Sequence, residues 1–566
     1  MIIGIDLGTT NSLVSVFQDG KSVLIPNSLG SFLTPSVVSM TEKDEVLVGL
    51  SARERLSTHS NLTASVFKRY MGTNKEIFLG RKKYRAEELS SLVLRSLKRD
   101  AEVFLGEKIE KAIITVPAYF SDAQRKATRI AGELAGLSVE GLLNEPTAAA
   151  LAYGLHELAD ESKFLVFDLG GGTFDVSILD LFEGVMEVRA STGDNFLGGE
   201  DFRNCIVDRF VERVVRKEKL PEEDQKLIGI IRNQAEIAKR ALTESNRVEM
   251  KVNWKDTTYT MPITSDEFSE WTEPLLARLR KPVERALRDS KIKASDLNQI
   301  VLAGGATRMP SIKKLVAKMF GILPASSLNP DEIVALGAGV QAGLKMKNSA
   351  LKEIVLTDVC PYTLGIEVSE RVGNDYKSGF YMPIIERNTI VPVSRSEVVN
   401  CVEDNQKVMR VRIYQGEARL VKDNIFLGEV AVRFPPLPAS EASADVRFTY
   451  DINGILEVEV HVHASGEKYR SVIEENPGVL TPKEIEEKLK SLSNLKIHPR
   501  EKEENRALLS RAERLYEESL GNIRRYIGEE MTLFISALDS QDEEKIGKAK
   551  ERIVYVLNDL EGNNLF

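Results

Sequence analysis

Two segments of the chain carry the same pattern, an apolar strand that ends in aspartate and turns on glycine. Residues 5–10 have the sequence Ile-Asp-Leu-Gly-Thr-Thr, and residues 167–172, which lie 162 positions later, have the sequence Phe-Asp-Leu-Gly-Gly-Gly. Backbone N–H groups of such turns can surround phosphate oxygens, and an aspartate at each strand end can hold hydrated Mg²⁺. Either turn alone is more typical of an ordinary hairpin. The shared offset favours a phosphate and magnesium site.

A third glycine-containing turn, here with a glycine pair, follows an apolar run later in the chain. Residues 301–310, Val-Leu-Ala-Gly-Gly-Ala-Thr-Arg-Met-Pro, predict a strand followed by a turn whose glycines let a flat base lie against the backbone. Arg308 can stack on that base. Residues 144–150 predict a helix of small residues that packs closely against the segment around residues 337–339. Residues 20–22, Gly-Lys-Ser, lack the first glycine of a P-loop and are interpreted as a hairpin turn.

The patterns along the chain predict four segments. Residues 1–350 alternate short β-branched runs with helical stretches, as α/β domains do, and the repeated turn predicts two similar lobes around a cleft. Residues 351–358 form a short apolar run between charges. Residues 359–478 alternate apolar and polar positions, which predicts a separate antiparallel β domain. Residues 479–566 have apolar residues at helical spacing and predict a small helical bundle.

The composition argues against several other classes of protein. The chain has 566 residues, of which 42% are hydrophobic and 28% charged, and its net charge of −9 argues against nucleic acid as the main partner. Three widely spaced cysteines indicate neither a disulfide scaffold nor a zinc cluster. His461 and His463 alternate along a strand without a recognisable further ligand and are interpreted as part of a solvent face. No secretion signal or membrane-length apolar run is evident, so we expect a cytoplasmic protein without a membrane partner.

Taken in order, the motifs resemble the actin, sugar-kinase and heat-shock ATPase superfamily, and over essentially the full length the DnaK-type chaperones. The resemblance implies an actin-like α/β ATPase with two duplicated lobes, followed by an antiparallel β-sandwich and a C-terminal α-helical lid. A short arm at residues 72–86 and residues 496–501 resemble the specialised bacterial HscC branch. The motifs that carry the family resemblance are residues 4–12, 116–122, 144–153, 167–176, 193–202, 329–332, 364–367, 403–406 and 414–417.

The resemblance implies a site for ATP or ADP with Mg²⁺, and K⁺ is a further candidate ion. Lys68 matches the family lysine that orients the attacking water, Glu145, Asp168 and Thr173 complete the implied catalytic set, and Asp6 and Asp168 would hold Mg²⁺ through water. The implied nucleotide-binding residues are Gly8, Thr9, Thr10 and Asn11 in the first turn; Gly170, Gly171, Gly172, Gly198 and Gly199 in and after the second; Glu236, Lys239, Arg240 and Thr243 on the adenosine side; and Gly304, Gly305, Ala306, Arg308 and Asp331 on the opposite wall.

The resemblance also implies partners and a route between the domains. The β domain would hold an extended or unfolded polypeptide client, and a J-domain co-chaperone would assist. The implied peptide-binding positions are Ile366, Val399, Met409 and Val411, with Ser369 and Val402 arching over the peptide. The implied coupling positions are Pro117, Arg125, Ile354, Val355, Leu356 and Asp358, the last four within an interdomain linker at residues 351–358.

Several residues depart from the family pattern. Ser369 is small and polar at an arch position, which leaves the substrate preference open. Gly141 stands where many relatives have an arginine that helps to dock a J-domain protein, and Ala306 replaces a usual serine. The segment after Thr243 is short, which leaves recognition by a nucleotide-exchange factor open. The last four residues, Asn-Asn-Leu-Phe, lack the acidic motif of eukaryotic cytosolic members.

The leading hypothesis is an ATP-dependent chaperone that binds exposed apolar peptide segments and releases them under nucleotide control. A small-molecule kinase on the same ATPase fold is an alternative that leaves residues 359–566 without a role. An actin-like filament protein is a second alternative, which polymerisation of the ATP-loaded protein would support. A passive peptide-binding module is a third, and it predicts that Lys68→Ala leaves peptide release unaltered.

Overall fold

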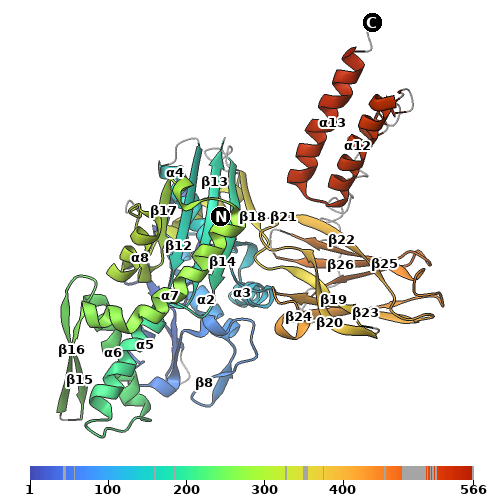
Figure 1. Ribbon diagram of the computed structural model, residues 1–566. Coiled ribbons are helices and arrows are strands. Elements are labelled where there is room, and N and C mark those ends of the chain that lie inside the picture. Colours follow the sequence, from blue (N-terminus) through green and yellow to red (C-terminus); the bar gives the residue numbers. More distant parts are fainter. Residues whose placement is uncertain are drawn as a thin grey trace. The chain divides into compact units, whose positions relative to one another are not determined.

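The computed structural model describes residues 1–563 except positions 42–45, 57, 158–160, 183–184, 256, 326–327, 348–354, 374, 452–453, 474–504, 506–507, 510, 513–514, 517–518 and 520 (Figure 1). The described chain forms two compact units. Unit 1 comprises Met1–Thr363, Glu386–Val391 and Ile452–Gly454, and unit 2 comprises Leu364–Ile385, Pro392–Asp451 and Ile455–Phe566.

The first lobe of unit 1 is built on a sheet with the strand order β11-β10-β1-β2-β3. Its strands are β1 (Ile2–Asp6), β2 (Asn11–Gln18), β3 (Lys21–Ile25), β10 (Lys111–Val116) and β11 (Ser138–Asn144), with β4 (Thr34–Pro35) beside β2. Strands β1, β10 and β11 run parallel, and β1 and β10 are mostly buried on both faces, which accounts for their continuous apolar runs. β2 and β3 meet at Asp19 and Gly20, so the predicted hairpin at residues 20–22 is confirmed.

The second lobe repeats this arrangement. Its sheet has the order β17-β12-β13-β14-β18-β21. In the first copy Asp6 pairs with residue 13, and in the second Asp168 pairs with residue 175, so the repeats share one register at the same offset of 162 residues. The predicted duplication is therefore confirmed. The strands are β12 (Glu161–Leu169), β13 (Phe174–Phe182), β14 (Val185–Asp194), β17 (Gln299–Ala303), β18 (Val355–Val359) and β21 (Ile390–Val391).

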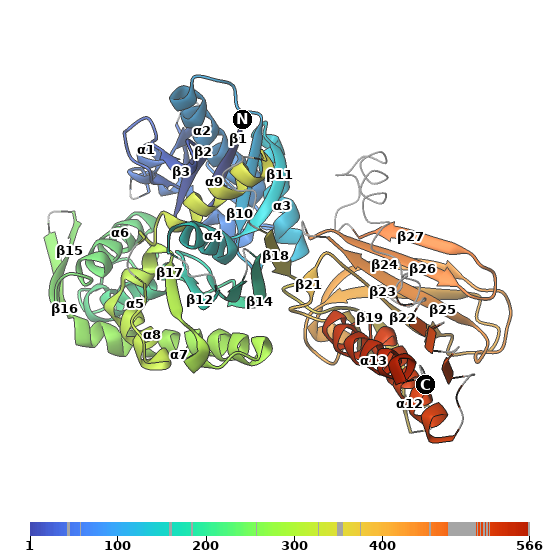
Figure 2. The ribbon, with the colours of Figure 1, turned by 90° about the horizontal axis from the view of Figure 1, so that it is seen from above.

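Helices and small sheets complete unit 1 (Figure 2). The small sheets are β5 (Val37–Met40), β6 (Val46–Val48) and β7 (Thr63–Ser65); β8 (Ile77–Leu79) and β9 (Lys82–Tyr84); and β15 (Arg247–Trp254) and β16 (Thr257–Thr264). The helices are α1 (Leu50–Arg53), α2 (Ala86–Leu105), α3 (Asp122–Leu134), α4 (Glu145–Glu157), α5 (Gly199–Phe210), α6 (Gln225–Ala241), α7 (Ser265–Ser290), α8 (Pro310–Phe320) and α9 (Ile333–Lys345).

Helices α4 and α9 join the two lobes at very short range. A Cβ atom at Gly337 would lie 1.7 Å from the backbone oxygen of Ala148, and one at Gly4 would lie 2.3 Å from the carbonyl carbon of Ala338. The close packing predicted for residues 144–150 against 337–339 is therefore confirmed. The packing holds the backbones of the two helices in direct contact.

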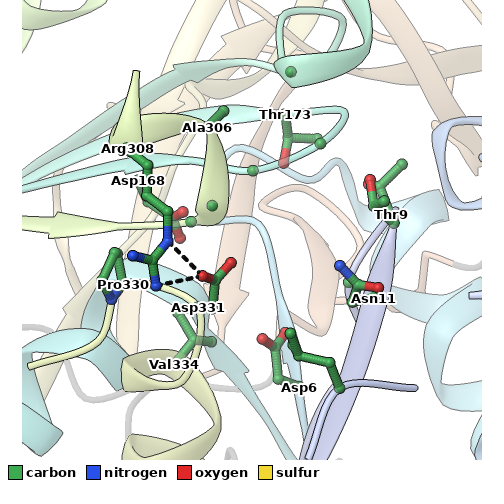
Figure 3. A pocket seen from close by; sticks show the side chains of 18 of the residues that line it. Asp6, Thr9, Asn11, Asp168, Thr173, Ala306, Arg308, Pro330, Asp331 and Val334 are labelled. Atoms are coloured by element: carbon green, nitrogen blue, oxygen red, sulfur yellow. Dashed lines mark hydrogen bonds and ion pairs between the residues drawn. The ribbon is translucent and has the colours of Figure 1, made fainter. Parts of the chain in front are cut away.

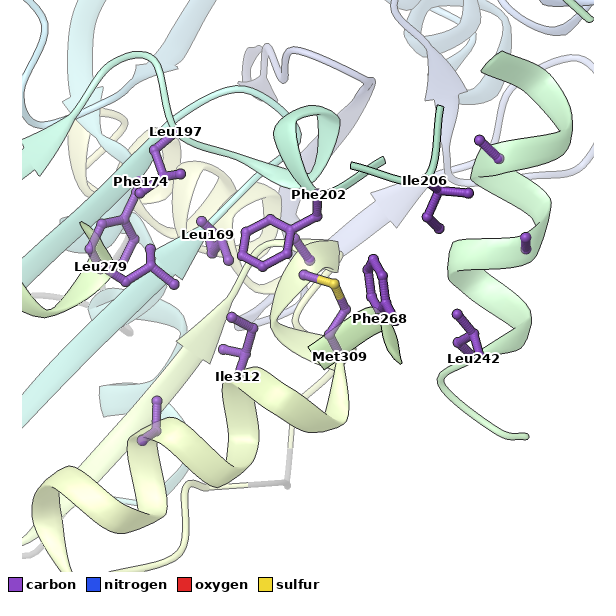
Figure 4. Packing of buried hydrophobic residues seen from close by; sticks show 14 of the residues in the cluster. Leu169, Phe174, Leu197, Phe202, Ile206, Leu242, Phe268, Leu279, Met309 and Ile312 are labelled. Carbon is purple, nitrogen blue, oxygen red and sulfur yellow. The ribbon is translucent and has the colours of Figure 1, made fainter. Parts of the chain in front are cut away.

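A hydrophobic cluster in the second lobe supports the glycine turn at residues 170–173 (Figure 4). Leu169 and Phe174, which bracket this turn, are fully buried in the cluster and pack among Leu197, Phe202 and Ile312. Burial of a side chain of this size contributes about 1.5–3 kcal/mol. The turn is consequently anchored at both ends while its own residues carry almost no side chains.

Unit 2 contains two four-stranded antiparallel sheets and helices. The first sheet has the order β20-β19-β23-β24 and the second the order β22-β25-β26-β27, as the alternating pattern predicts. Of the helical bundle predicted for residues 479–566, residues 479–504 lie outside the described residues, and α12 and α13 belong to the described part. The elements are β19 (Leu364–Val372), β20 (Asp375–Ile385), β22 (Val393–Asn400), β23 (Val408–Gln415), β24 (Ile425–Arg433), β25 (Ser443–Tyr450), β26 (Leu456–Val462), β27 (Lys468–Val472), α12 (Gly521–Asp539) and α13 (Glu543–Asn563).

The close packing of α4 on α9 makes a specific stability prediction. We expect Gly337→Ala to lower the free energy of unfolding of unit 1 by about 1–3 kcal/mol or more, because the added methyl group meets backbone rather than a movable side chain. Gly547→Ala in α13 is the matched control: its Cβ meets nothing within 4 Å, and we expect a gain of up to about 1 kcal/mol. Calorimetry measures the effect of Gly337→Ala on the unfolding transition of unit 1, which is identified because ADP shifts it. An unchanged free energy of unfolding in Gly337→Ala would contradict the packing.

Candidate nucleotide site

The two glycine turns face each other across a cavity of about 340 Å³ in unit 1. Figure 3 shows Asp6, Thr9 and Asn11 of the first lobe and Asp168 and Thr173 of the second around this cavity. A Cβ atom at Gly171 would lie 1.8 Å from the hydroxyl oxygen of Thr10, so the second turn approaches the first this closely only because it lacks a side chain. Backbone N–H groups of both turns are thereby available to a single polyphosphate.

Lys68 is a buried cation of this cavity, next to Glu145. Its Nζ donates a hydrogen bond to Glu145 Oε1 at 2.7 Å, and the lysine is only 3% exposed. Two features of the backbone position the pair. Val66 adopts φ 60°, a left-handed conformation that is costly for a β-branched residue, immediately before the short helical turn Phe67–Tyr70 that carries the lysine. Glu145 begins α4, where the helix dipole favours a carboxylate.

Three buried carboxyl groups near Lys68 have raised pKa values. Burial, followed by the Glu145 carboxylate, raises the pKa of Asp6 to about 7 and that of Asp175 to about 7. Burial and then Glu145, Asp175 and Asp6 raise the pKa of Asp168 well above its ordinary value. One lysine does not balance this group of carboxylates.

The donor set fits a magnesium ion. Asp6 and Asp168 line the same cavity, and Asp168 Oδ2 is buried without a hydrogen-bond partner in the part of the chain that the structure describes. A buried carboxylate oxygen of this kind calls for a cation, and Mg²⁺ prefers oxygen ligands. Thr115 donates a hydrogen bond to Asp6 Oδ1 at 3.1 Å and orients that carboxylate.

The far end of the cavity has the walls expected for a nucleoside. On one side α6 presents Glu236 with Lys239 and Arg240, which form ion pairs with it at 2.8 Å each. On the other side, Arg308 forms an ion pair with Asp331 at 2.7 Å directly after the glycine pair (Figure 3). Apolar residues that the sequence analysis did not select also line the cavity: Leu13, Leu33, Met309, Pro330 and Val334.

Nearly all predicted nucleotide-binding residues line this one cavity. They are Gly8, Thr9, Thr10, Asn11, Gly170, Gly171, Gly199, Glu236, Lys239, Arg240, Thr243, Gly304, Gly305, Ala306, Arg308 and Asp331, together with Asp6, Lys68, Glu145, Asp168 and Thr173. Gly172 and Gly198 do not line it. They lie behind the turn, where a Cβ atom at Gly198 would be 2.5 Å from the backbone nitrogen of Gly172.

Sequence reasoning missed an ion pair that links the lobes. Arg69 bonds Asp201 Oδ2 at 2.5 Å and donates through Nε to the carbonyl oxygen of Gly172 at 3.1 Å. Asp201 also accepts a hydrogen bond from the Gly198 N–H at 2.8 Å. The arginine of the first lobe therefore holds the second phosphate turn in place. In the sequence, only the position of Arg69 next to Lys68 pointed to a role for this arginine.

A second missed set of contacts leads away from the cavity. Asp175 Oδ1 accepts a hydrogen bond from the Tyr119 N–H at 2.9 Å. The Tyr119 carbonyl in turn accepts hydrogen bonds from the Tyr362 hydroxyl at 2.6 Å and from Asn195 Nδ2 at 2.7 Å, and the two tyrosine rings lie 4.2 Å apart. One peptide group thus connects Asp175, the strand partner of the cavity residue Asp168, to the segment that follows residues 351–358.

The predicted coupling residues meet within unit 1. The Arg125 guanidinium donates to Asn144 Oδ1 at 2.7 Å, and Asn144 Nδ2 donates to Asp358 Oδ2 at 2.8 Å. Residues 355–357 pair in parallel with β14, and Asp358 pairs with β21. Pro117 follows β10, and its carbonyl accepts a hydrogen bond from the Phe120 N–H. Ile354 lies outside the described residues.

The predicted peptide-binding residues all lie in unit 2 and differ in exposure. Ile366 and Val411 are 2% and 3% exposed, whereas Val399, Met409 and Ser369 are half-buried. Val402 is 39% exposed. Two of these six positions are therefore buried core positions, and the other four are more accessible.

Comparison with known proteins decides the family. The model of the Hsp70 protein family matches residues 2–79 and 74–562. The chain is 42% identical over 484 residues to the chaperone protein DnaK of Thermotoga petrophila, with 83% of this chain and 80% of the relative covered. It is 42% and 41% identical over 483 residues to the DnaK proteins of Thermosipho africanus and Thermosipho melanesiensis. The chain belongs to the Hsp70 family. It is therefore an ATPase and an ATP-dependent chaperone, as the resemblance implied.

In the described residues no helix combines the length and apolar character that a membrane span needs.

The raised carboxyl pKa values make a prediction about pH. In the unfolded chain Asp175 has a pKa near 3.8, and in the folded chain it holds its proton to about pH 7. Between these values the unfolded state has lost a proton that the folded state keeps, so unit 1 without metal or nucleotide becomes less stable as pH rises from about 4 to about 7. Asp175→Asn is expected to reduce this decline by up to about 1.4 kcal/mol per pH unit.

Denaturant unfolding of the full chain in EDTA, from pH 4 to pH 8, measures this slope. Asp208→Asn, at an exposed position of α5, is the matched control and should leave the slope unchanged. Equal slopes in the native protein and in Asp175→Asn would contradict the assignment of a buried proton to Asp175.

Proposed function

We propose that Mg·ATP in the cavity between the two lobes controls the affinity of unit 2 for extended apolar peptides, through the linker at residues 351–358 and the contacts that residues 355–358 make in unit 1. The observation that carries this proposal is the location of Asn144 and Glu145. Asn144 bonds Asp358 of the proposed linker, and the next residue, Glu145, bonds Lys68 in the cavity. A shift of either residue moves the other because they share a peptide bond.

In the proposed reaction the chain positions a water molecule and the terminal phosphate of ATP. Lys68 is held by Glu145 and is available to orient the water and to offset charge on the transferred phosphoryl group, and Thr173 lines the cavity on the opposite side. Asp6 and Asp168 would hold Mg²⁺, which neutralises the charge of the phosphates. The two turns fix the phosphate geometry with their N–H groups, and K⁺ is a further ion that the excess of carboxylates would accept.

The finer assignments are also proposals. We assign Ile366, Val399, Met409 and Val411 to the peptide pocket and Ser369 and Val402 to its rim, which would hold an extended client by main-chain hydrogen bonds and an apolar pocket. We propose a J-domain co-chaperone as partner and a cytoplasmic location. Membership of the HscC branch remains a prediction. Nucleic acid is not a proposed partner, given the net charge of −9.

The proposal is tested by peptide dissociation with and without ATP. We expect ATP to accelerate release of a bound unfolded peptide by at least tenfold, which corresponds to a decrease of about 1.4 kcal/mol in the activation free energy of release. Thr173→Ala and Lys68→Ala should reduce hydrolysis and the effect of ATP on release. Thr258→Ala, an exposed position in β16, is the control. Peptide affinity that is indifferent to ATP would contradict the proposal.

The Tyr362 hydroxyl provides a test of the coupling route. Tyr362→Phe removes the hydrogen bond to the Tyr119 carbonyl and leaves the ring, so it should weaken docking of this segment by about 1 kcal/mol. We expect the acceleration of peptide release by ATP to fall roughly fivefold, as that free energy requires, with ATP affinity nearly unchanged. Tyr376→Phe, at a 59% exposed position of β20, is the matched control. Identical release kinetics in Tyr362→Phe and the native protein would exclude the route.

A further inference from the structure

Three metal-ligating side chains meet on one face of the sandwich, outside the nucleotide site. Asp445 of β25 pairs directly with His461 of β26, and His463 lies two residues further along the same face. One candidate ligand atom from each of Asp445, His461 and His463 lies within 4.8 Å of the other two. The sequence analysis assigned both histidines to a solvent face because no third ligand was recognisable. Strand pairing supplies that third ligand from a position 16 residues away.

From this juxtaposition we propose that Asp445, His461 and His463 form a zinc-binding site. Two imidazole nitrogens and one carboxylate oxygen are a donor set typical of Zn²⁺, and solvent can complete a tetrahedral shell. Ligand atoms in such a shell lie roughly 3.3 Å apart at zinc–ligand distances of ~2.0–2.1 Å. His463 Nε2 is already 3.0 Å from Asp445 Oδ2. Both side chains are about 40% exposed, so small rotations can bring the third ligand into range.

A hydrogen bond behind the cluster orients one of the ligands. The Ser443 hydroxyl bonds His463 Nδ1 at 2.9 Å, and the backbone N–H of His463 donates to the Ser443 carbonyl at 3.1 Å. These contacts fix the ring so that Nε2 is directed to the Asp445 carboxylate. A second hydrogen bond that holds the outer nitrogen of a histidine is the usual support of a metal ligand. The site would fasten β25 to β26 from outside the sandwich core.

One neighbouring charge opposes cation binding and gives the proposal a directional test. Lys468 of β27 pairs with His461 and therefore belongs to the same face. It is exposed, so its ammonium group can turn away into solvent. Removing this charge with Lys468→Gln should strengthen zinc binding roughly two- to fivefold, the range expected for an exposed charge pair. A metal-free hydrogen-bonded cluster predicts no such gain.

Equilibrium dialysis of Zn²⁺ against the full chain tests the site, with the protein reduced and saturated with Mg·ADP. We expect one Zn²⁺ bound per chain, with affinity lowered more than roughly tenfold by His463→Gln, His461→Gln or Asp445→Asn. His59→Gln, in the other unit, is the control. Binding of Co²⁺ should give a visible spectrum without thiolate charge transfer, which separates this site from the cysteines.

A second measurement does not depend on ATP binding or hydrolysis. Zn²⁺ should raise the unfolding temperature of the native chain and not that of His463→Gln, because the metal binds only the folded strand pair. Zinc binding that is unchanged by all three ligand substitutions, or no stoichiometric binding to the native chain, would overturn the proposal. In that case Asp445 and His463 form a metal-free ion pair.

Discussion

The central constraint on unit 1 is the group of buried carboxyl groups near Lys68. Asp6, Glu145 and Asp168 line the cavity, Asp175 is buried next to Asp168 as its strand partner, and Lys68 bonds Glu145. In a medium of low dielectric such a group is unfavourable unless protons or metal ions balance it. The site is therefore built for a ligand that brings cations with it, and Mg·nucleotide is such a ligand. The glycine turns then need only provide donors for the phosphates.

The carboxyl groups near Lys68 also connect the cavity to the rest of unit 1 by hydrogen bonds. Glu145 begins α4 next to Asn144, which bonds Asp358, and Asp175 bonds the Tyr119 peptide, which bonds Tyr362. A change of charge at the cavity therefore alters hydrogen bonds that reach Asp358 and Tyr362, which follow the two lobes in the sequence. Coupling between nucleotide and peptide can therefore be described physically. Both ligands act on one set of hydrogen bonds, so each changes the population of the conformation that the other prefers.

The sequence allowed the repeated parts of the site to be predicted, and not the parts that depend on long-range contacts. The two Asp-Leu-Gly turns were recognisable because strand and turn patterns are local and their shared offset is visible in the chain. Lys68 could be selected only by resemblance, since its burial depends on the unusual backbone of Val66 and on a partner 77 residues away. Arg69 with Asp201, and Asp445 with His463, were missed for the same reason: strand pairing and lobe closure create these pairs.

The most direct test of the central claim is the dependence of ATP affinity on Mg²⁺ in Asp6→Asn, Asp168→Asn and the double variant. If both carboxylates hold one ion, Mg²⁺ should strengthen ATP binding to the native protein, each single substitution should remove most of that gain, and the double substitution should add little more. The account would be contradicted if the two single substitutions each removed a separate part of the Mg²⁺-dependent increase in ATP affinity and the double variant lost the sum of the two parts. It would also be contradicted if Mg²⁺ left the ATP affinity of the native protein unchanged.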